Sequence, residues 1–361
     1  MDFNFKEITK KESSALEIIK IVLLLQVVIG HALALSFPSM NALTNNLGAT
    51  LFKSVFSFGR EAAYLFIFLS GFFTSKIFIN EAKTIELFTV IVKRIKRIYP
   101  IYLTALLLTI ILDYIGFNIY NYSVYFLNGF NCDTTQQFTY YHFIFNLFSL
   151  QPVFSETFGS NTPLWTLGYL VQFYIIGVIL KKISIIITFN YYYLMLGAML
   201  ITSIFNLEFA SLFFVWFSGV LIRYFNFRLN KSPKFIFLIS CILVIILIQR
   251  FSPMYYSIFL TPLLGFFILI SISVIPKRVA GLNLLTFPRL PDISYSLYAV
   301  HMPILFLIYG FFENLVNMNN LVWQFSYIIL SFLICVFCAY IVLKINTASF
   351  KFFKWKKILN L

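Results

Sequence analysis

Two of the three histidines in this 361-residue chain stand inside apolar stretches, HALALSF and AVHMPIL. An imidazole surrounded by hydrocarbon must be hydrogen-bonded, because an unsatisfied polar group there costs free energy. Imidazole is also the side chain that most readily takes up and returns a proton near neutral pH. His31 and His301 are therefore candidates for acid–base chemistry, whereas the pattern around His142 assigns that residue no role.

Glu61 is a candidate partner for His31. Glu17 and Lys20 stand where an apolar run begins, and His31 follows roughly 20 Å further along a helix, beyond the middle of a bilayer. The stretch GREAAYLFIFLSGFF runs in the opposite direction, so Glu61 should reach a similar depth. An ionisable residue within a membrane indicates function, and we expect Glu61 to orient His31. A purely structural pair, or neutralisation of Glu61 by Arg60, explains the same pattern.

The segment KRIKRIYPIYL, at residues 93–103, indicates a second kind of chemistry. Arg94 and Arg97 share one helix face, and Pro100 interrupts the helical hydrogen-bond ladder just after them. Two guanidinium groups side by side suit a phosphate. Basic residues that merely flank the cytoplasmic end of a span produce the same cluster, and this alternative stays open.

These residues require a membrane scaffold. The chain is 60% hydrophobic and 11% charged, with 46 Phe and 22 Tyr, which lies outside the range of soluble domains. About 20 apolar residues span a bilayer as a helix, so we predict an all-α polytopic protein with about ten transmembrane helices in a single membrane domain over 1–361. The N-terminus is too polar for a signal peptide, so the first span should be retained. The predicted spans are 18–37, 54–78, 98–117, 164–180, 183–204, 209–226, 235–252, 255–275, 293–312 and 321–344.

Charge sets the expected orientation. With the N-terminus inside, all but three of the 27 Lys and Arg residues fall on the cytoplasmic side or its flank, as the positive-inside rule requires. Both termini are then cytoplasmic, and residues 345–361 form a basic cytoplasmic tail. The apolar piece 140–150 is too short to cross and is expected to be re-entrant or interfacial. The net charge of +14 follows from this flanking pattern, so no nucleic-acid partner is expected.

One connection is too long to be a simple turn. Residues 118–162 should form a long external loop that is rich in Asn, Tyr, Thr and Gln, contains Asp133 and Glu156, and lacks Lys and Arg. Long ordered loops are usually functional. Aromatic, amide and carboxylate groups suit a hydroxyl-rich ligand such as a sugar, although an external cap with interfacial Tyr side chains has the same composition.

Five motifs occur in order along the chain, and together they resemble the acyltransferase-3 family of integral membrane O-acyltransferases over residues 18–304. The first is an acidic residue, a basic residue and a histidine in LEIIKIVLLLQVVIGHALALSF. The others are YLFIFLSGFF at 64–73, RIKRIYPIYL at 94–103, TPLWTLGYLVQFY at 162–174 and DISYSLYAVHMPI at 292–304. Many members carry a glutamate five residues after the tryptophan, where this chain has Leu170, so the role of that acid is absent or moved.

The resemblance implies transfer of an acyl group, by default acetyl from cytoplasmic acetyl-CoA, to a hydroxyl of a surface, O-antigen-type or lipid-linked glycan. It implies that His31 is the general base or, as the alternative, a nucleophile that carries the acyl group, and that Arg94 and Arg97 hold the CoA phosphates. His301 should lie nearer the cytoplasmic half than His31, where it either binds the donor or hydrogen-bonds a neighbouring helix. The expected acceptor contacts are Trp165, Asp133 and Glu156.

The implied setting is a bacterial inner membrane, with an acyl-CoA, a glycan and the lipid bilayer as partners and no metal. These patterns do not predict an oligomeric state. Two transporter classes also fit a basic, aromatic, polytopic chain. A polysaccharide flippase or polymerase would show about twelve or more spans, and a proton-coupled transporter, which could use buried His and Glu as a relay, usually has two related halves that this sequence lacks.

Overall fold

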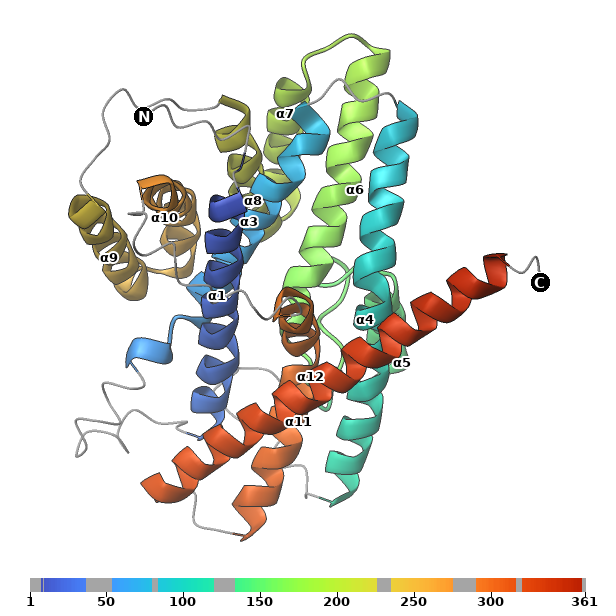
Figure 1. Ribbon diagram of the computed structural model, residues 1–361, viewed down its shortest axis with the longest axis vertical. Helices are drawn as coiled ribbons and strands as arrows, with labels where there is room; N and C mark the ends of the chain where they lie inside the picture. Colours follow the sequence, from blue (N-terminus) through green and yellow to red (C-terminus); the bar gives the residue numbers. More distant parts are fainter. Residues whose placement is uncertain are drawn as a thin grey trace. The chain divides into compact units, whose positions relative to one another are not determined.

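The computed structural model describes residues 8, 10–36, 54–79, 84–119, 134–225, 235–274, 290–315 and 320–358. Within these ranges the chain forms α-helices joined by turns, without strands. Figure 1 labels the helices and colours them along the sequence, from blue at the N-terminus to red at the C-terminus. The helices are α1 (Lys10–Ser36), α3 (Gly59–Ile79), α4 (Thr84–Ile119), α5 (Tyr140–Leu147), α6 (Leu164–Ile186), α7 (Tyr191–Phe205), α8 (Leu207–Phe225), α9 (Phe235–Phe251), α10 (Met254–Val274), α11 (Leu290–Leu315) and α12 (Leu321–Ile358).

Eight of the described helical segments are long and apolar enough to cross a membrane, which confirms a polytopic membrane protein. Two of the ten predicted spans are instead shorter apolar helices, because α7 has 15 residues and α9 has 17. At 1.5 Å per residue, α7 is about 22 Å long, which is less than the thickness of the hydrocarbon core. The apolar piece at 140–150 contains only the eight-residue helix α5, in line with the expectation that it does not cross.

Two helices extend well beyond their predicted spans. Helix α4 has 36 residues and continues through Pro100. Helix α12 has 38 residues and continues past 344 into the segment that was expected to be a separate basic tail. A helix of that length measures about 57 Å, nearly twice the hydrocarbon thickness, so part of α12 must lie outside the hydrocarbon.

The chain divides into two compact units. The first unit comprises Met1–Leu23, Arg60–Lys93 and Tyr169–Pro288, and the second comprises Leu24–Gly59, Arg94–Gly168 and Arg289–Leu361. The boundaries between the units fall inside α1, α4 and α6 and after the first residue of α3, so each of these four helices contributes residues to both units. A functional site can therefore be described within either unit.

Glycines allow α3 and α8 of the first unit to approach each other closely. A Cβ atom on Gly71 would lie 1.9 Å from the carbonyl oxygen of Trp216, and one on Gly219 would lie 2.2 Å from the carbonyl oxygen of Phe68. Small residues at such positions let membrane helices pack backbone against backbone. The rings of Trp216 and Phe78 pack beside this contact, with centroids 5.8 Å apart.

We expect Gly71→Ala to prevent normal packing of α3 against α8, because its Cβ would collide with backbone that cannot move aside. Overpacking of this kind typically costs about 1–3 kcal/mol. The yield of folded protein in detergent and its Tm should therefore both fall. Gly197→Ala is the matched control, since a Cβ atom there would have nothing within 4 Å. Equal Tm values for the two variants would contradict the close approach of α3 and α8.

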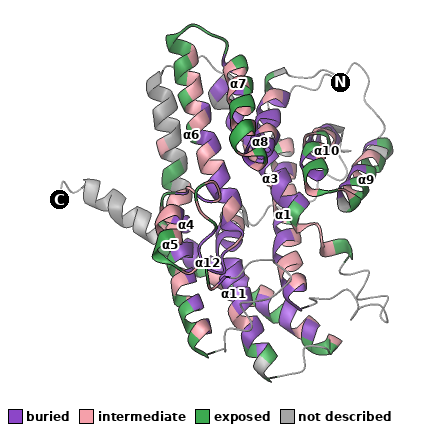
Figure 2. Cartoon of the chain, turned by 180° about the vertical axis from the view of Figure 1, so that it is seen from behind, coloured by how far each residue is buried: buried purple, intermediate pink, exposed green. Residues whose placement is uncertain are grey.

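Helix α11 lies at the centre of the second unit. In its most apolar window 78% of the residues are buried, compared with 28% for α12, which packs along it. Figure 2 shows the same difference, with α11 mostly purple. The histidine that the sequence analysis placed on this helix, His301, is therefore in the best-enclosed part of the unit.

Candidate active site

His31 of α1 and His301 of α11 are hydrogen-bonded to each other, with His31 Nδ1 2.9 Å from His301 Nε2. Their rings are nearly parallel, at 6°, and the ring centroids are 5.2 Å apart. That separation equals the hydrogen-bond length plus the distance from each ring centre to its own nitrogen. The two rings therefore meet edge to edge in one plane, and the hydrogen bond follows the lone-pair direction of the accepting nitrogen. His301 is fully buried, and His31 is half-buried. The structure thus brings together the two histidines that the sequence singled out.

The hydrogen bonds of His301 determine where the protons lie. His301 Nδ1 is 2.8 Å from the carbonyl oxygen of Tyr298 and 3.2 Å from that of Leu297. A carbonyl oxygen can only accept, so His301 Nδ1 carries a proton. In neutral His301 the other nitrogen, Nε2, therefore accepts, and His31 Nδ1 must donate to it. The lone pair of neutral His31 is then on Nε2, where it can take a proton from a bound group.

Helix α12 contacts both helices that carry the histidines. Gln324 donates from Nε2 to the carbonyl oxygen of Ser36, at the end of α1, over 3.1 Å. Cys335 Sγ donates to the carbonyl oxygen of His301 over 3.7 Å. These contacts hold the two helices in register, which an edge-to-edge hydrogen bond requires.

The segment that leads into α6 also packs against α11. The hydroxyls of Thr166 and Tyr298 are 2.6 Å apart, and Asn161 donates from Nδ2 to the carbonyl oxygen of Ala299 over 2.9 Å. Because Tyr298 supplies a carbonyl that holds His301 Nδ1, these contacts connect the tryptophan motif to the histidine pair.

Glu61 lies in the first unit, whereas His31 lies in the second. Within its own unit the buried Glu61 carboxylate pairs with its neighbour Arg60, whose Nη2 is 2.9 Å from Oε1. This pairing is the neutralisation of Glu61 by Arg60 that the sequence leaves open as an alternative. Orientation of His31 by Glu61 stays a prediction, while the orienting contact that the second unit provides comes from His301.

The placement of His301 corrects one expectation. We expected it nearer the cytoplasmic half than His31, but side chains 2.9 Å apart lie at the same level. A residue count along one helix does not give depth, because helix tilt depends on packing against neighbouring helices.

The other predicted site residues are more scattered. Arg94 and Arg97 lie on α4, but their side chains are outside the described part of the structure, as is all of Asp133. Glu156 is exposed and accepts from Gln137 Nε2 over 2.5 Å. Trp165 is half-buried in the first turn of α6, beside Thr166. Their roles in binding stay predictions.

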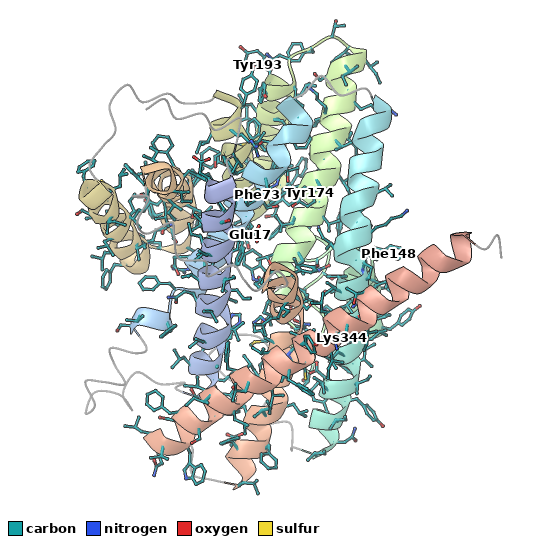
Figure 3. All side chains as sticks on the ribbon, viewed as in Figure 1. Glu17, Phe73, Phe148, Tyr174, Tyr193 and Lys344 are labelled. Atoms are coloured by element: carbon teal, nitrogen blue, oxygen red, sulfur yellow. The ribbon has the colours of Figure 1, made fainter. Side chains whose placement is uncertain are left out.

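The charged residues at the start of the first motif are paired in the first unit. Lys20 Nζ is 2.5 Å from Glu17 Oε1 and lies 4.9 Å from the centre of the Phe73 ring, so a cation–π contact joins α1 to the SGFF stretch of α3. Ser70, in the same stretch, hydrogen-bonds the hydroxyl of Tyr174 on α6. Figure 3 labels Glu17, Phe73 and Tyr174 on these three helices. Three of the sequence motifs therefore meet in one place.

Sequence reasoning missed an acid that reaches the tryptophan helix. Glu208, in the first turn of α8, accepts a hydrogen bond from the hydroxyl of Tyr169, the residue before Leu170. The rings of Tyr169 and Phe209 also touch, with centroids 5.7 Å apart. A carboxylate from another helix therefore lies beside the helix that lacks one at position 170. An acid in the first turn of an apolar helix is the only signal for it in the sequence.

The fold and the site define a class: a multi-pass membrane protein whose buried core holds a hydrogen-bonded histidine pair. The chain belongs to the acyltransferase-3 family, since the family's acyltransferase domain matches residues 13–340. No curated protein and no solved structure matches it. Family membership implies an enzyme that uses an acyl donor and an acceptor at the bilayer, and it supports acyl transfer over transport.

Proposed function

We propose that this protein is a membrane O-acyltransferase that moves acetyl from acetyl-CoA to a hydroxyl of a cell-surface or lipid-linked glycan, such as O-antigen, in a bacterial inner membrane. The observation that carries the proposal is the His31–His301 pair within an acyltransferase-family domain. Transfer to an alcohol needs a general base that can take up and return a proton near neutral pH. The half-buried His31 carries its lone pair on Nε2, away from His301.

The proposed reaction needs only the acceptor hydroxyl, the thioester and the two histidines. His31 Nε2 takes the proton of the acceptor hydroxyl as its oxygen attacks the thioester carbonyl. The carbon–sulfur bond breaks, and the CoA thiolate leaves with the proton that His31 returns. His301 accepts from His31 Nδ1 throughout, so it holds the ring in the productive tautomer and disperses the charge of the transient imidazolium.

The proposal assigns separate binding residues to the donor and to the acceptor. Arg94 and Arg97 would hold the phosphates of the donor at the cytoplasmic end of α4. Trp165, Asp133 and Glu156 would contact the acceptor from the external side. The aromatic ring of Trp165 suits an apolar sugar face, and the two carboxylates suit sugar hydroxyls.

Purified protein tests the proposal directly. The donor is acetyl-CoA, and the acceptor is surface polysaccharide from the producing cells, treated with mild alkali to remove ester groups. We expect release of free thiol that requires the polysaccharide, together with base-labile acetyl esters on the glycan by mass spectrometry. A transporter would release no thiol. Thiol release without ester on the glycan would leave an acyltransferase but refute the glycan acceptor.

A further inference from the structure

Helices α8 and α10 of the first unit pack against each other, and an open groove of about 460 Å³ lies between them. We call it the α8–α10 groove, and both helices are labelled in Figure 1. Both of its walls lie within the stretches of α8 and α10 that are long and apolar enough to cross a membrane. The lining residues are Ser218, Leu221 and Ile222 of α8 and Phe259, Pro262, Leu263 and Phe266 of α10.

The sequence explains why this space is left open. Ser218 places a small side chain on the α8 wall, and Pro262 lies inside α10, where a proline removes one helical hydrogen bond and displaces the preceding turn. Both helices are held against Phe68 of α3 through other positions. A Cβ atom on Gly219 would lie 2.2 Å from the Phe68 carbonyl oxygen, and one on Gly265 would lie 2.2 Å from the Phe68 ring. Helix α3 therefore holds α8 and α10 together without lining the groove.

The walls of the groove suit an apolar ligand. Ser218 carries the one polar side chain among the lining residues, and its hydroxyl already donates to the carbonyl oxygen of Val215 over 2.7 Å. Phe259 and Leu263 are 52% and 45% exposed, so the groove is continuous with the surface that α10 presents to the bilayer. An empty groove would forfeit dispersion contacts along both walls. Hydrocarbon from the bilayer is therefore the chemistry that this groove accepts.

The shape of the groove favours a single chain over a helix of another protein. Membrane helices pack closely where small residues line the interface, because their backbones must approach each other. Here the glycines of α8 and α10 face α3, and bulky side chains such as Phe259 and Phe266 line the groove. Among single chains, those of the bilayer phospholipids surround the protein in excess, and binding follows mass action.

We propose that the α8–α10 groove is a lipid-binding site that holds one acyl chain of a bilayer phospholipid. The chain contacts both walls, so it links α10 to α8 as a core side chain would. This phospholipid is retained when the surrounding lipid is exchanged for detergent. The site uses none of the residues of the proposed reaction and does not rest on the proposed function.

Native mass spectrometry of the protein after extensive washing in detergent tests the site. We expect a single phospholipid to remain bound to each chain. Leu263→Trp fills the groove from the α10 wall, and the fraction of chains with bound phospholipid should fall about 10-fold, because the lipid loses packing contacts. Leu196→Trp on α7 is the matched control. Leu196 and Leu263 are both 45% exposed, but Leu196 does not line the groove, so retention should stay unchanged.

Ser218→Leu narrows the groove from the other wall and replaces Leu263→Trp if the Tm shows that this variant does not fold. Nanodiscs of phosphatidylethanolamine and phosphatidylglycerol, with a diazirine in the middle of one acyl chain of the latter, test the unmodified protein. Cross-links to the α8 and α10 walls should exceed those around Leu196. Equal labelling, unchanged retention in a folded groove variant, retention of a polyprenyl phosphate instead, or a dimer without phospholipid would each overturn the proposal.

Discussion

His31→Gln should abolish acyl transfer while the protein still inserts and folds. Glutamine can keep a hydrogen bond to His301 Nε2 through its amide, but it cannot take up a proton near neutral pH. Loss of a positioned general base is typically worth about 10² to 10⁴ in rate. Thiol release from acetyl-CoA by the purified variant measures the loss, and its Tm in detergent reports folding.

His142→Gln is the matched control for this experiment. His142 is half-buried on the short helix α5, and its ring hydrogen-bonds Thr139 at the start of that helix, so its loss should leave the rate unchanged. His31→Ala removes the hydrogen bond as well as the base, and it should be as inactive as His31→Gln. Near-normal turnover in His31→Gln would end the catalytic role of His31 and make it a link between α1 and α11.

Substitutions of His301 should show the opposite pattern. The proposed role of His301 is to accept from His31 Nδ1 and donate to the carbonyl of Tyr298, and a glutamine can do both through Oε1 and Nε2. We therefore expect His301→Gln to retain much of the activity. His301→Ala removes the orienting group, and we expect a loss of about 10- to 100-fold in kcat.

The double variant distinguishes one coupled unit from two independent residues. If His301 acts only through His31, then His31→Ala combined with His301→Ala should be no slower than His31→Ala alone. Additive losses would mean that His301 contacts the donor or acceptor itself. Inactive His301→Gln with active His31→Gln would exchange the two roles and make His301 the base.

The sequence alone determined the class of protein and the positions of most helices. Composition and the length of apolar runs are evident in the chain without any tertiary contact. They therefore indicated a polytopic helical protein in which the piece at 140–150 is too short to cross. Boundaries were less certain, as α7 and α12 illustrate, because apolar character does not report where helical hydrogen bonds end. The sequence also selected His31 and His301, since an imidazole in an apolar run stands out without any knowledge of its partner.

The tertiary structure alone decided which residues are partners. His31 and His301 are 270 residues apart in the chain, so no local pattern could pair them. Depth fixes one coordinate of a side chain, but hydrogen bonding needs the direction in which each helix presents it. The same reason explains why Asn161 and Glu208 escaped notice: Asn161 reaches the carbonyl of Ala299, and Glu208 reaches Tyr169, through helix packing that only the folded chain defines.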